Sequence, residues 1–155
     1  MFRQVGYHDP DAAKLIAEVQ QEYVLRYGGH DATRIDAADF APPQGLFVVG
    51  YADGKAVVCG GWRARDSTEP LFTDGDAEVK RMYVVPAARR RGLARLMLAE
   101  LERTARAAGR RRILLETGSA QPEAIALYES EGYTAVPQFG IYRCEPSSRC
   151  YGKAL

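Results

Sequence analysis

The stretch from Val85 to Ala94 constrains the fold most, because it joins a strand-like run to a strong helix pattern. The turn between them carries three consecutive arginines, Arg89–Arg91, followed by Gly92 and, after one residue, Ala94. The first N–H groups of a helix have no partner inside the helix, and the helix dipole favours negative charge there. Small residues at Gly92 and Ala94 leave room for a close approach to the backbone. The turn therefore predicts a phosphate site made of backbone N–H groups.

Hydrophobic periodicity and turn signals divide the rest of the chain into strands and helices. The strands are expected over residues 2–7, 46–51, 56–62, 77–85, 112–117, 133–136 and 141–144. One helix is expected to start at a cap formed by Asp9 or Asp11 and to end at Gly28-Gly29. Two more are expected over residues 92–108 and 121–131. Residues 30–44 are typical of a loop with room for one short helical turn.

The order of these elements predicts an α/β fold in which helices lie on the faces of one mixed sheet. The strand at 77–85, the helix at 92–108 and the strand at 112–117 form a parallel βαβ unit. Asp53-Gly54 predicts a hairpin between two of the antiparallel strands. The chain has 155 residues with no internal repeat and no linker, so a single domain over residues 1–155 is expected.

Composition excludes several classes of protein. The net charge is +1, with positive charge concentrated locally at residues 89–91 and 110–112, so no nucleic-acid or membrane partner is indicated. The cysteines at 59, 144 and 150 are too scattered for a metal site or a disulfide framework. Neither a signal peptide nor an apolar run of membrane-spanning length is present, which favours a cytoplasmic location. A nicotinamide-binding Rossmann domain is disfavoured because no Gly-x-Gly-x-x-Gly follows a strand.

Three segments, in order, resemble the GNAT acetyltransferase superfamily. Arg89-x-x-Gly92-x-Ala94 resembles its acyl-CoA signature, (Gln/Arg)-x-x-Gly-x-(Gly/Ala). Residues 78–84 resemble its fourth strand, and residues 121–133 resemble its later Asn-x-x-Ala-x-x-Leu-Tyr-x-x-x-Gly-(Phe/Tyr) segment. The resemblance covers about residues 46–145. It implies a mixed, mostly antiparallel sheet of six or seven strands with helices on both faces. It also implies an N-acetyltransferase that uses acetyl-CoA and no metal.

The resemblance also implies how acetyl-CoA is held. Backbone N–H groups at the start of the helix would bind the CoA pyrophosphate, in the segment Arg89, Arg90, Arg91, Gly92, Leu93, Ala94 and Arg95. Arg90 stands where the family often has glycine, so this binding is expected if Arg90 has ordinary helical-turn dihedrals. The pantetheine arm would lie along the main chain of Met82, Tyr83 and Val84, while their side chains form core. A backbone amide near Tyr83 or Val84 would polarise the thioester carbonyl. Gln121 replaces the usual Asn and would bind the same arm or the strand end.

Glu78 is the candidate general base, since it lies eleven residues before Arg89, where the family often places a glutamate. A protonated amine cannot attack until a carboxylate within reach takes its proton. Period-two alternation puts Glu78, Lys80 and Met82 on one face of the strand and Arg81 and Tyr83 on the other. The alternative is that Glu78 begins the strand at an exposed end and pairs with Lys80.

Tyr128 is the candidate general acid. The departing thiolate needs a proton, and thiols and phenols titrate within about two pH units of each other. A phenol beside the sulfur is therefore a plausible donor, and Tyr128 occupies the tyrosine position of the later family segment. The alternative is an aromatic core residue that packs beside Leu127.

The acceptor site is expected between residues 23–47 and 138–151, the regions that shape this site in the family. The side chains that could line it are Tyr23, Arg26, Tyr27, Phe40, Phe139, Tyr142 and Tyr151. An aromatic cleft with an arginine suits a small amine that carries a carboxylate, such as an amino acid, while a peptide or protein N-terminus is an alternative. Further alternatives are an acyl-CoA sensor without catalysis and a nucleic-acid binder. A homodimer is expected from the family.

Overall fold

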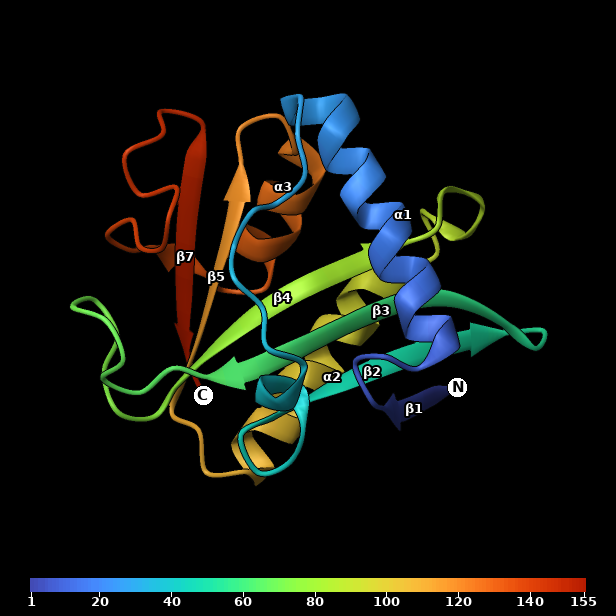
Figure 1. Cartoon of the computed structure of the whole chain (residues 1–155), viewed down its shortest axis with the longest axis horizontal. Helices are drawn as coiled ribbons and strands as arrows, with labels where there is room; N and C mark the ends of the chain where they lie inside the picture. The colour runs from blue at the N-terminus through green and yellow to red at the C-terminus, as the bar shows by residue number, and fades with distance from the viewer.

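A computed structural model describes residues 1–155 and forms one seven-stranded sheet in the order β1-β2-β3-β4-β5-β7-β6 (Figure 1). Only β4 and β5 run parallel, and every other neighbouring pair is antiparallel. The strands are β1 Phe2–Val5, β2 Gly45–Ala52, β3 Lys55–Ala64, β4 Asp76–Val84, β5 Arg112–Gly118, β6 Thr134–Ala135 and β7 Ser148–Ala154. The helices are α1 Pro10–Tyr27, α2 Leu93–Ala107 and α3 Pro122–Ser130, with short 3₁₀ turns η1 Ala37–Phe40 and η2 Pro86–Ala88.

Helix α1 begins and ends where local chemistry stops a helix. Asp9 is its N-cap, since Asp9 Oδ1 accepts a hydrogen bond from the Asp11 N–H at 2.9 Å, and Pro10 follows at the first position. Gly28 adopts a left-handed φ of +80° and closes the last turn. The helix packs against one face of the sheet and buries Ala12, Leu15 and Val19 there.

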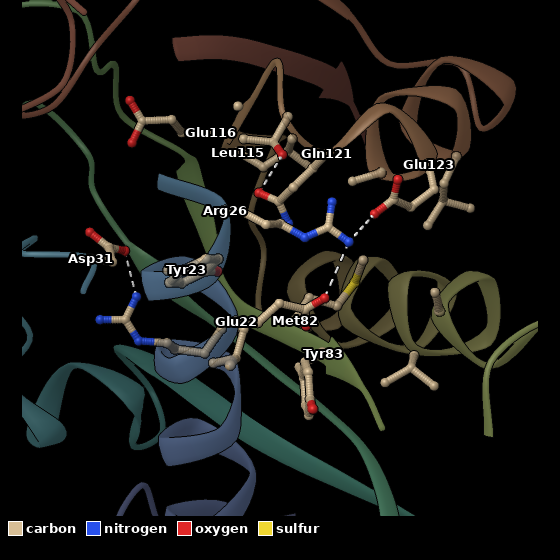
Figure 2. Close-up of a pocket in the computed structure, with 18 of the residues that line it drawn as sticks. Glu22, Tyr23, Arg26, Asp31, Met82, Tyr83, Leu115, Glu116, Gln121 and Glu123 are labelled. Atoms are coloured by element: carbon tan, nitrogen blue, oxygen red, sulfur yellow. Dashed lines mark hydrogen bonds and ion pairs between the residues drawn. The ribbon is translucent and has the colours of Figure 1, made fainter. Parts of the chain in front are cut away.

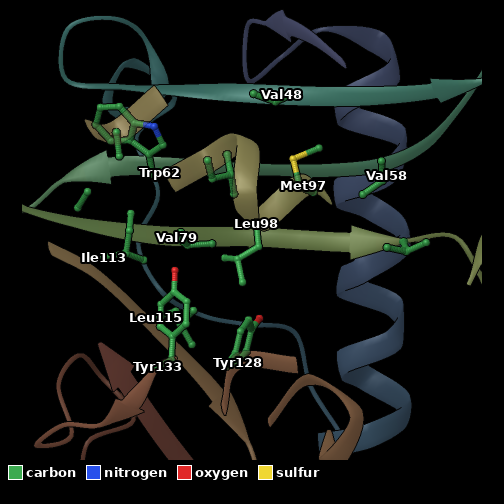
Figure 3. Packing of buried hydrophobic residues seen from close by; sticks show 14 of the residues in the cluster. Val48, Val58, Trp62, Val79, Met97, Leu98, Ile113, Leu115, Tyr128 and Tyr133 are labelled. Atoms are coloured by element: carbon green, nitrogen blue, oxygen red, sulfur yellow. The ribbon is translucent and has the colours of Figure 1, made fainter. Parts of the chain in front are cut away.

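Helices α2 and α3 cover the opposite face. The stripe of α2 that holds Met97, Leu98 and Leu101 packs on Val79 and Trp62, and Tyr128 of α3 joins the same cluster (Figure 3). Trp62 Nε1 donates a hydrogen bond to Thr104 Oγ1 at 3.0 Å, so its buried polar atom is satisfied. The predicted fold, a mixed and mostly antiparallel sheet with helices on both faces, is confirmed. None of the helices is long and apolar enough to cross a membrane.

Strands β4 and β5 pair over a short length and then separate. Their register contains only Asp76↔Arg112, Ala77↔Ile113 and Glu78↔Leu114. Beyond this seam both strands continue unpaired with each other, while β5 pairs with β7 along its whole length (Figure 1). The divergence leaves main-chain groups of β4 without a neighbouring strand on that side. It also opens a wedge in the middle of the sheet.

A β-bulge interrupts the pairing of β3 with β4 next to this wedge. The register shifts between Cys59 and Gly61, and Arg81 opposite the shift has a φ of +59°. Lys80 and Arg81 consequently point to the same face, where both contact Asp31. The strict alternation expected from the sequence is therefore wrong here. Met82 packs on the α2 side instead of sharing the face of Lys80.

Near the C-terminus the expected strand at residues 141–144 is also wrong. Gly140 has a φ of +78°, and the Glu145 N–H bonds back to the Tyr142 carbonyl at 2.9 Å, so this segment is a succession of turns. The closing strand is β7, which comes later and pairs with both β5 and β6.

Candidate active site

The wedge between β4 and β5 holds a cavity of about 970 Å³. Its walls come from β4, β5, the C-terminal half of α1, the first turn of α2 and helix α3 (Figure 2). Eleven of the predicted site residues line it: Met82, Tyr83, Val84, Arg89, Arg90, Gly92, Leu93, Ala94, Arg95, Gln121 and Tyr128. Arg91 and Glu78 do not line this cavity.

The turn before α2 presents free backbone N–H groups to this cavity. The first backbone hydrogen bond of α2 runs from the Leu96 N–H to the Gly92 carbonyl at 3.0 Å, and the helix has no side-chain cap. The N–H groups from Arg90 to Arg95 therefore donate to no backbone acceptor. Arg90 and Gly92 both have left-handed φ values, +64° and +76°, a pattern that gathers successive N–H groups into an anion-binding concavity. The ordinary helical dihedrals expected for Arg90 are wrong, because this position takes the conformation that glycine favours.

The arginine that opens the turn is held by the cavity wall. Arg89 Nε donates to the Val84 carbonyl at 2.9 Å, and its Nη2 lies 2.8 Å from Glu22 Oε2 on α1. Its guanidinium also lies 5.7 Å from the centre of the Tyr83 ring. These contacts tie the turn to both β4 and α1, and Arg89 is a positioning residue for the wall.

Tyr128 and Gln121 lie on the α3 side of the cavity. Tyr128 is buried, its ring centre is 5.9 Å from that of Tyr133, and its hydroxyl has no hydrogen-bond partner in the protein. Burial raises the pKa of Tyr128 to about 12, so the phenol keeps its proton at neutral pH. Gln121 Oε1 accepts hydrogen bonds from Tyr27 Oη at 3.1 Å and Thr117 Oγ1 at 3.3 Å. Gln121 thereby fastens the start of α3 to β5 and α1.

Glu78 lies in a second cavity, of about 360 Å³. It is only 4% exposed, and its Oε1 accepts from Arg63 Nε at 3.1 Å and lies 3.5 Å from Arg65 Nε. The alternative of an exposed Glu78 paired with Lys80 is therefore wrong, because the carboxylate is buried between two arginines. Its Oε1 is engaged by guanidinium groups, which leaves Glu78 poorly disposed to take a proton from a molecule in the large cavity.

Glu116 was missed by the sequence interpretation, and it is the one residue that lines both cavities. It follows the seam by two residues on β5, beside Leu115 (Figure 2). Its Oε2 accepts a hydrogen bond from Ser148 Oγ at 2.9 Å. Burial raises the pKa of Glu116, although Ser148 and Lys80 act in the opposite direction. The signal in the sequence was a single carboxylate directly after the apolar run Ile113–Leu115.

A family model described as Acetyltransferase (GNAT) family matches residues 13–133, which is most of the chain. The chain belongs to the GNAT acetyltransferase family. An IAA acetyltransferase from Azospirillum brasilense is 36% identical over 143 residues, covering 92% of this chain and 89% of the relative. The uncharacterized N-acetyltransferase YjgM from Escherichia coli K12 is 31% identical over 139 residues, covering 86% and 80%.

Solved GNAT structures share the fold over the whole chain. A candidate acyl-CoA N-acyltransferase from Klebsiella pneumoniae superposes with a TM-score of 0.80 at 28% identity, covering 100% of this chain and 97% of that one. A GNAT acetyltransferase from Elizabethkingia anophelis with acetyl-CoA bound gives a TM-score of 0.70 at 11% identity, covering 100% and 97%. The protein is therefore a GNAT-type N-acetyltransferase, from a family that uses acetyl-CoA.

Only part of the expected acceptor cleft forms in this GNAT protein. Tyr23, Arg26, Tyr27 and Tyr142 line the large cavity, as the sequence predicts. Phe40, Phe139 and Tyr151 do not, because each is buried in a separate hydrophobic cluster.

Arg26 does not serve as a free anion ligand either. It lies 3.2 Å from Glu22 and 2.6 Å from Glu123 (Figure 2). It also donates a hydrogen bond to the Ala120 carbonyl. The guanidinium that the sequence suggested for an acceptor carboxylate is thus already neutralised within the protein.

Proposed function

We propose that this GNAT protein transfers an acetyl group from acetyl-CoA to a primary amine of a small molecule. The observation that carries the proposal is the wedge between β4 and β5, where free N–H groups, a buried phenol and a carboxylate line one cavity. The names of the relatives, an IAA acetyltransferase and an N-acetyltransferase, agree with acetyl transfer.

The residues of the wedge fit acetyl-CoA, which supplies an activated acetyl thioester when bound. The backbone N–H groups from Arg90 to Arg95 have no acceptor in the protein and suit the pyrophosphate. The unpaired edge of β4 at Met82, Tyr83 and Val84 suits the amides of the pantetheine arm, in the manner of an added strand. A backbone amide near Tyr83 or Val84 would stabilise negative charge on the thioester oxygen.

Two protons must move during transfer, and the cavity offers a group for each. Tyr128 holds its proton at neutral pH and would give it to the departing thiolate. The amine must lose a proton before it attacks, and Glu116 and Glu78 are the two candidate acceptors. We place Glu116 first, because it faces the large cavity with Oε1 free, whereas Glu78 is reached only from the second cavity.

Variants of the two glutamates and of the tyrosine test this mechanism by thiol release over a panel of small primary amines. Glu116→Gln and Tyr128→Phe should each lower kcat/KM by about a hundredfold or more, with little change in acetyl-CoA affinity. Glu78→Gln should have the smaller effect, and Glu100→Gln on the outer surface of α2 is the matched control. Wild-type turnover in both Glu116→Gln and Glu78→Gln would show that neither carboxylate takes the proton.

The pH dependence of kcat/KM gives a second readout. A base works only when deprotonated, and burial raises the pKa of Glu116, so activity should fall on acidification at a pH above the ordinary glutamate value of about 4.3. That acidic limb should disappear in Glu116→Gln and persist in Glu78→Gln.

Binding and turnover together separate the alternatives. Calorimetry should show tight binding of acetyl-CoA, with NADH and ATP as controls. Binding without transfer to any amine would indicate a sensor. Turnover of peptides but not of small amines would indicate a peptide or protein acetyltransferase. Absence of acetyl-CoA binding would overturn the whole assignment of the wedge.

A further inference from the structure

The bulge in β4 places two cationic side chains side by side in the wall of the large cavity. Lys80 is 7% exposed and Arg81 is 4% exposed, and both line the cavity under the loop that follows α1. Because the backbone of Arg81 is in the left-handed region, the consecutive residues Lys80 and Arg81 face the same side of the sheet, whereas a regular strand would alternate them. A left-handed non-glycine residue costs free energy and often marks a functional site.

Lys80 and Arg81 share a single carboxylate partner in the protein, Asp31. Asp31 Oδ2 accepts from Lys80 Nζ at 3.0 Å and from Arg81 Nη1 at 2.6 Å. Arg81 Nε is buried without any acceptor, and Lys80 keeps ammonium donors that the protein does not use. A buried cation without a partner is costly, so the surplus positive charge calls for an anion from outside the chain.

The other charged groups near this pair do not supply that anion. Glu78 is engaged by Arg63 and Arg65. Glu116 Oε2 accepts from Ser148 Oγ, and Glu116 makes no ion pair with Lys80 or Arg81, whose carboxylate partner is Asp31. Tyr23 lies close to Arg81, but burial raises the pKa of its phenol and keeps it neutral. The phosphates of acetyl-CoA have their own N–H groups at the start of α2, a different wall of the cavity.

We propose that Lys80 and Arg81 form a subsite for a carboxylate of the acceptor. The acceptor is then a small amino acid-like molecule whose amine meets Glu116 while its carboxylate meets Lys80. Lys80 on β4 and Glu116 on β5 each lie two residues beyond the Glu78↔Leu114 pair and line the same cavity, so the spacer between amine and carboxylate is short. The inference rests on the proposed amine acetylation and replaces Arg26 as the carboxylate ligand.

The test compares amino acids with their carboxamides as acceptors, in wild type and in Lys80→Met. Lys80→Met keeps an unbranched side chain one atom shorter and removes the charge, and Lys55→Met on the exposed β2–β3 hairpin is the matched control. The wild type should prefer the carboxylate member of a pair by about tenfold or more in kcat/KM, and Lys80→Met should lose that preference. Comparing ratios between variants cancels the intrinsic difference in amine reactivity between the two substrates.

Arg81→Gln and Lys80→Arg sharpen the comparison. Arg81→Gln should also lose the preference for the carboxylate over the carboxamide. Lys80→Arg should retain part of that preference, because a guanidinium carries the same charge as an ammonium. Circular dichroism and acetyl-CoA affinity establish that each variant is folded. Equal kcat/KM for acid and carboxamide in the wild type would overturn the subsite, as would a preference that survives in both Lys80→Met and Arg81→Gln.

A binding measurement separates failure of the subsite from failure of the proposed function. Binding is measured by calorimetry in the presence of CoA. The wild type should bind an N-acetyl amino acid at least about tenfold more tightly than the corresponding carboxamide, and Lys80→Met should bind the two equally. If no amine is acetylated and this selectivity is seen, the proposed function fails and the subsite stands. If amines are acetylated without such selectivity, the function stands and the subsite is wrong.

Discussion

Arg90 and Gly92 determine at the level of single residues how the N–H groups before α2 are arranged. Both are left-handed, and an added Cβ at Gly92 would meet nothing within 4 Å. The requirement for glycine there is consequently conformational and not one of space. Arg90 adopts the same region with a full side chain, at a cost of about 1–2 kcal/mol.

Gly92→Ala should reduce acetyl-CoA affinity about tenfold, because alanine disfavours the left-handed turn that aligns the N–H groups. Calorimetry measures the affinity, and chemical denaturation should show a loss of about 1 kcal/mol of stability. Gly109→Ala is a matched control, since Gly109 has a φ of +80°, also with nothing within 4 Å, at the other end of α2. It should lose similar stability and keep its affinity. Equal affinities for wild type and Gly92→Ala would argue against the N–H site.

Among the elements, the loop between α1 and η1 is fastened to the bulge of β4 by Asp31. Burial of Asp31 opposes its charge, but Lys80 and Arg81 outweigh this and hold the pKa of the carboxyl well below its usual range. Gln20 Oε1 accepts from the Asp31 N–H at 2.8 Å and fixes the loop from the α1 side. The ion pair thus links the loop, α1 and β4.

Asp31→Asn should lower the free energy of unfolding by about 3 kcal/mol at pH 7, because two buried cations lose their partner. A carboxyl with a depressed native pKa contributes stability above its unfolded value, about 3.9, and loses it as pH falls through the native pKa. The difference from wild type should therefore shrink below about pH 4, as followed by urea denaturation across pH. Asp53→Asn in the β2–β3 turn is the control, and a difference that does not change with pH would contradict this account.

Much of the element pattern could be predicted from the sequence because it depends on local signals. Helical spacing in α2, the cap at Asp9 and the Asp53-Gly54 turn all act within a few residues. The bulge at Arg81 could not be predicted, because it exists only in the register of β4 against β3. Strand β7 was missed because its strand character comes from pairing with β5 rather than from an apolar run.

The candidate site likewise contains residues that the sequence could predict and residues that it could not. The turn at Gly92 and the later segment with Tyr128 follow local patterns, and both line the large cavity. The surroundings of Glu78 depend on Arg63 across the neighbouring strand, and the importance of Glu116 depends on the divergence of β4 from β5. Contacts between residues far apart in the chain produce no characteristic residue spacing, so a single sequence does not reveal them.

For the whole molecule, residues of both β4 and β5 line the wedge, so a ligand bound there would contact both parts of the sheet and should stabilise the folded state. A hundredfold excess of acetyl-CoA over its Kd should add about 2.7 kcal/mol, which raises Tm by several degrees. Thermal denaturation followed by circular dichroism measures this, with ATP as a control ligand. Gly92→Ala should show a smaller shift at the same concentration. A Tm independent of acetyl-CoA would mean that the wedge does not bind it.

The short seam between β4 and β5 has a consequence for cooperativity. Three residue pairs join the strands β1–β4 to the strands β5–β7, whereas β5 and β7 pair at seven positions. Local opening costs least where the fewest hydrogen bonds must break, so amides beside the seam should exchange with solvent before those at the centre of β3. The sheet is geometrically continuous, and we expect its two parts, β1–β4 and β5–β7, to separate first at this seam. The cavity that we propose for acetyl-CoA therefore lies where the two parts of the sheet are held together by the fewest residue pairs.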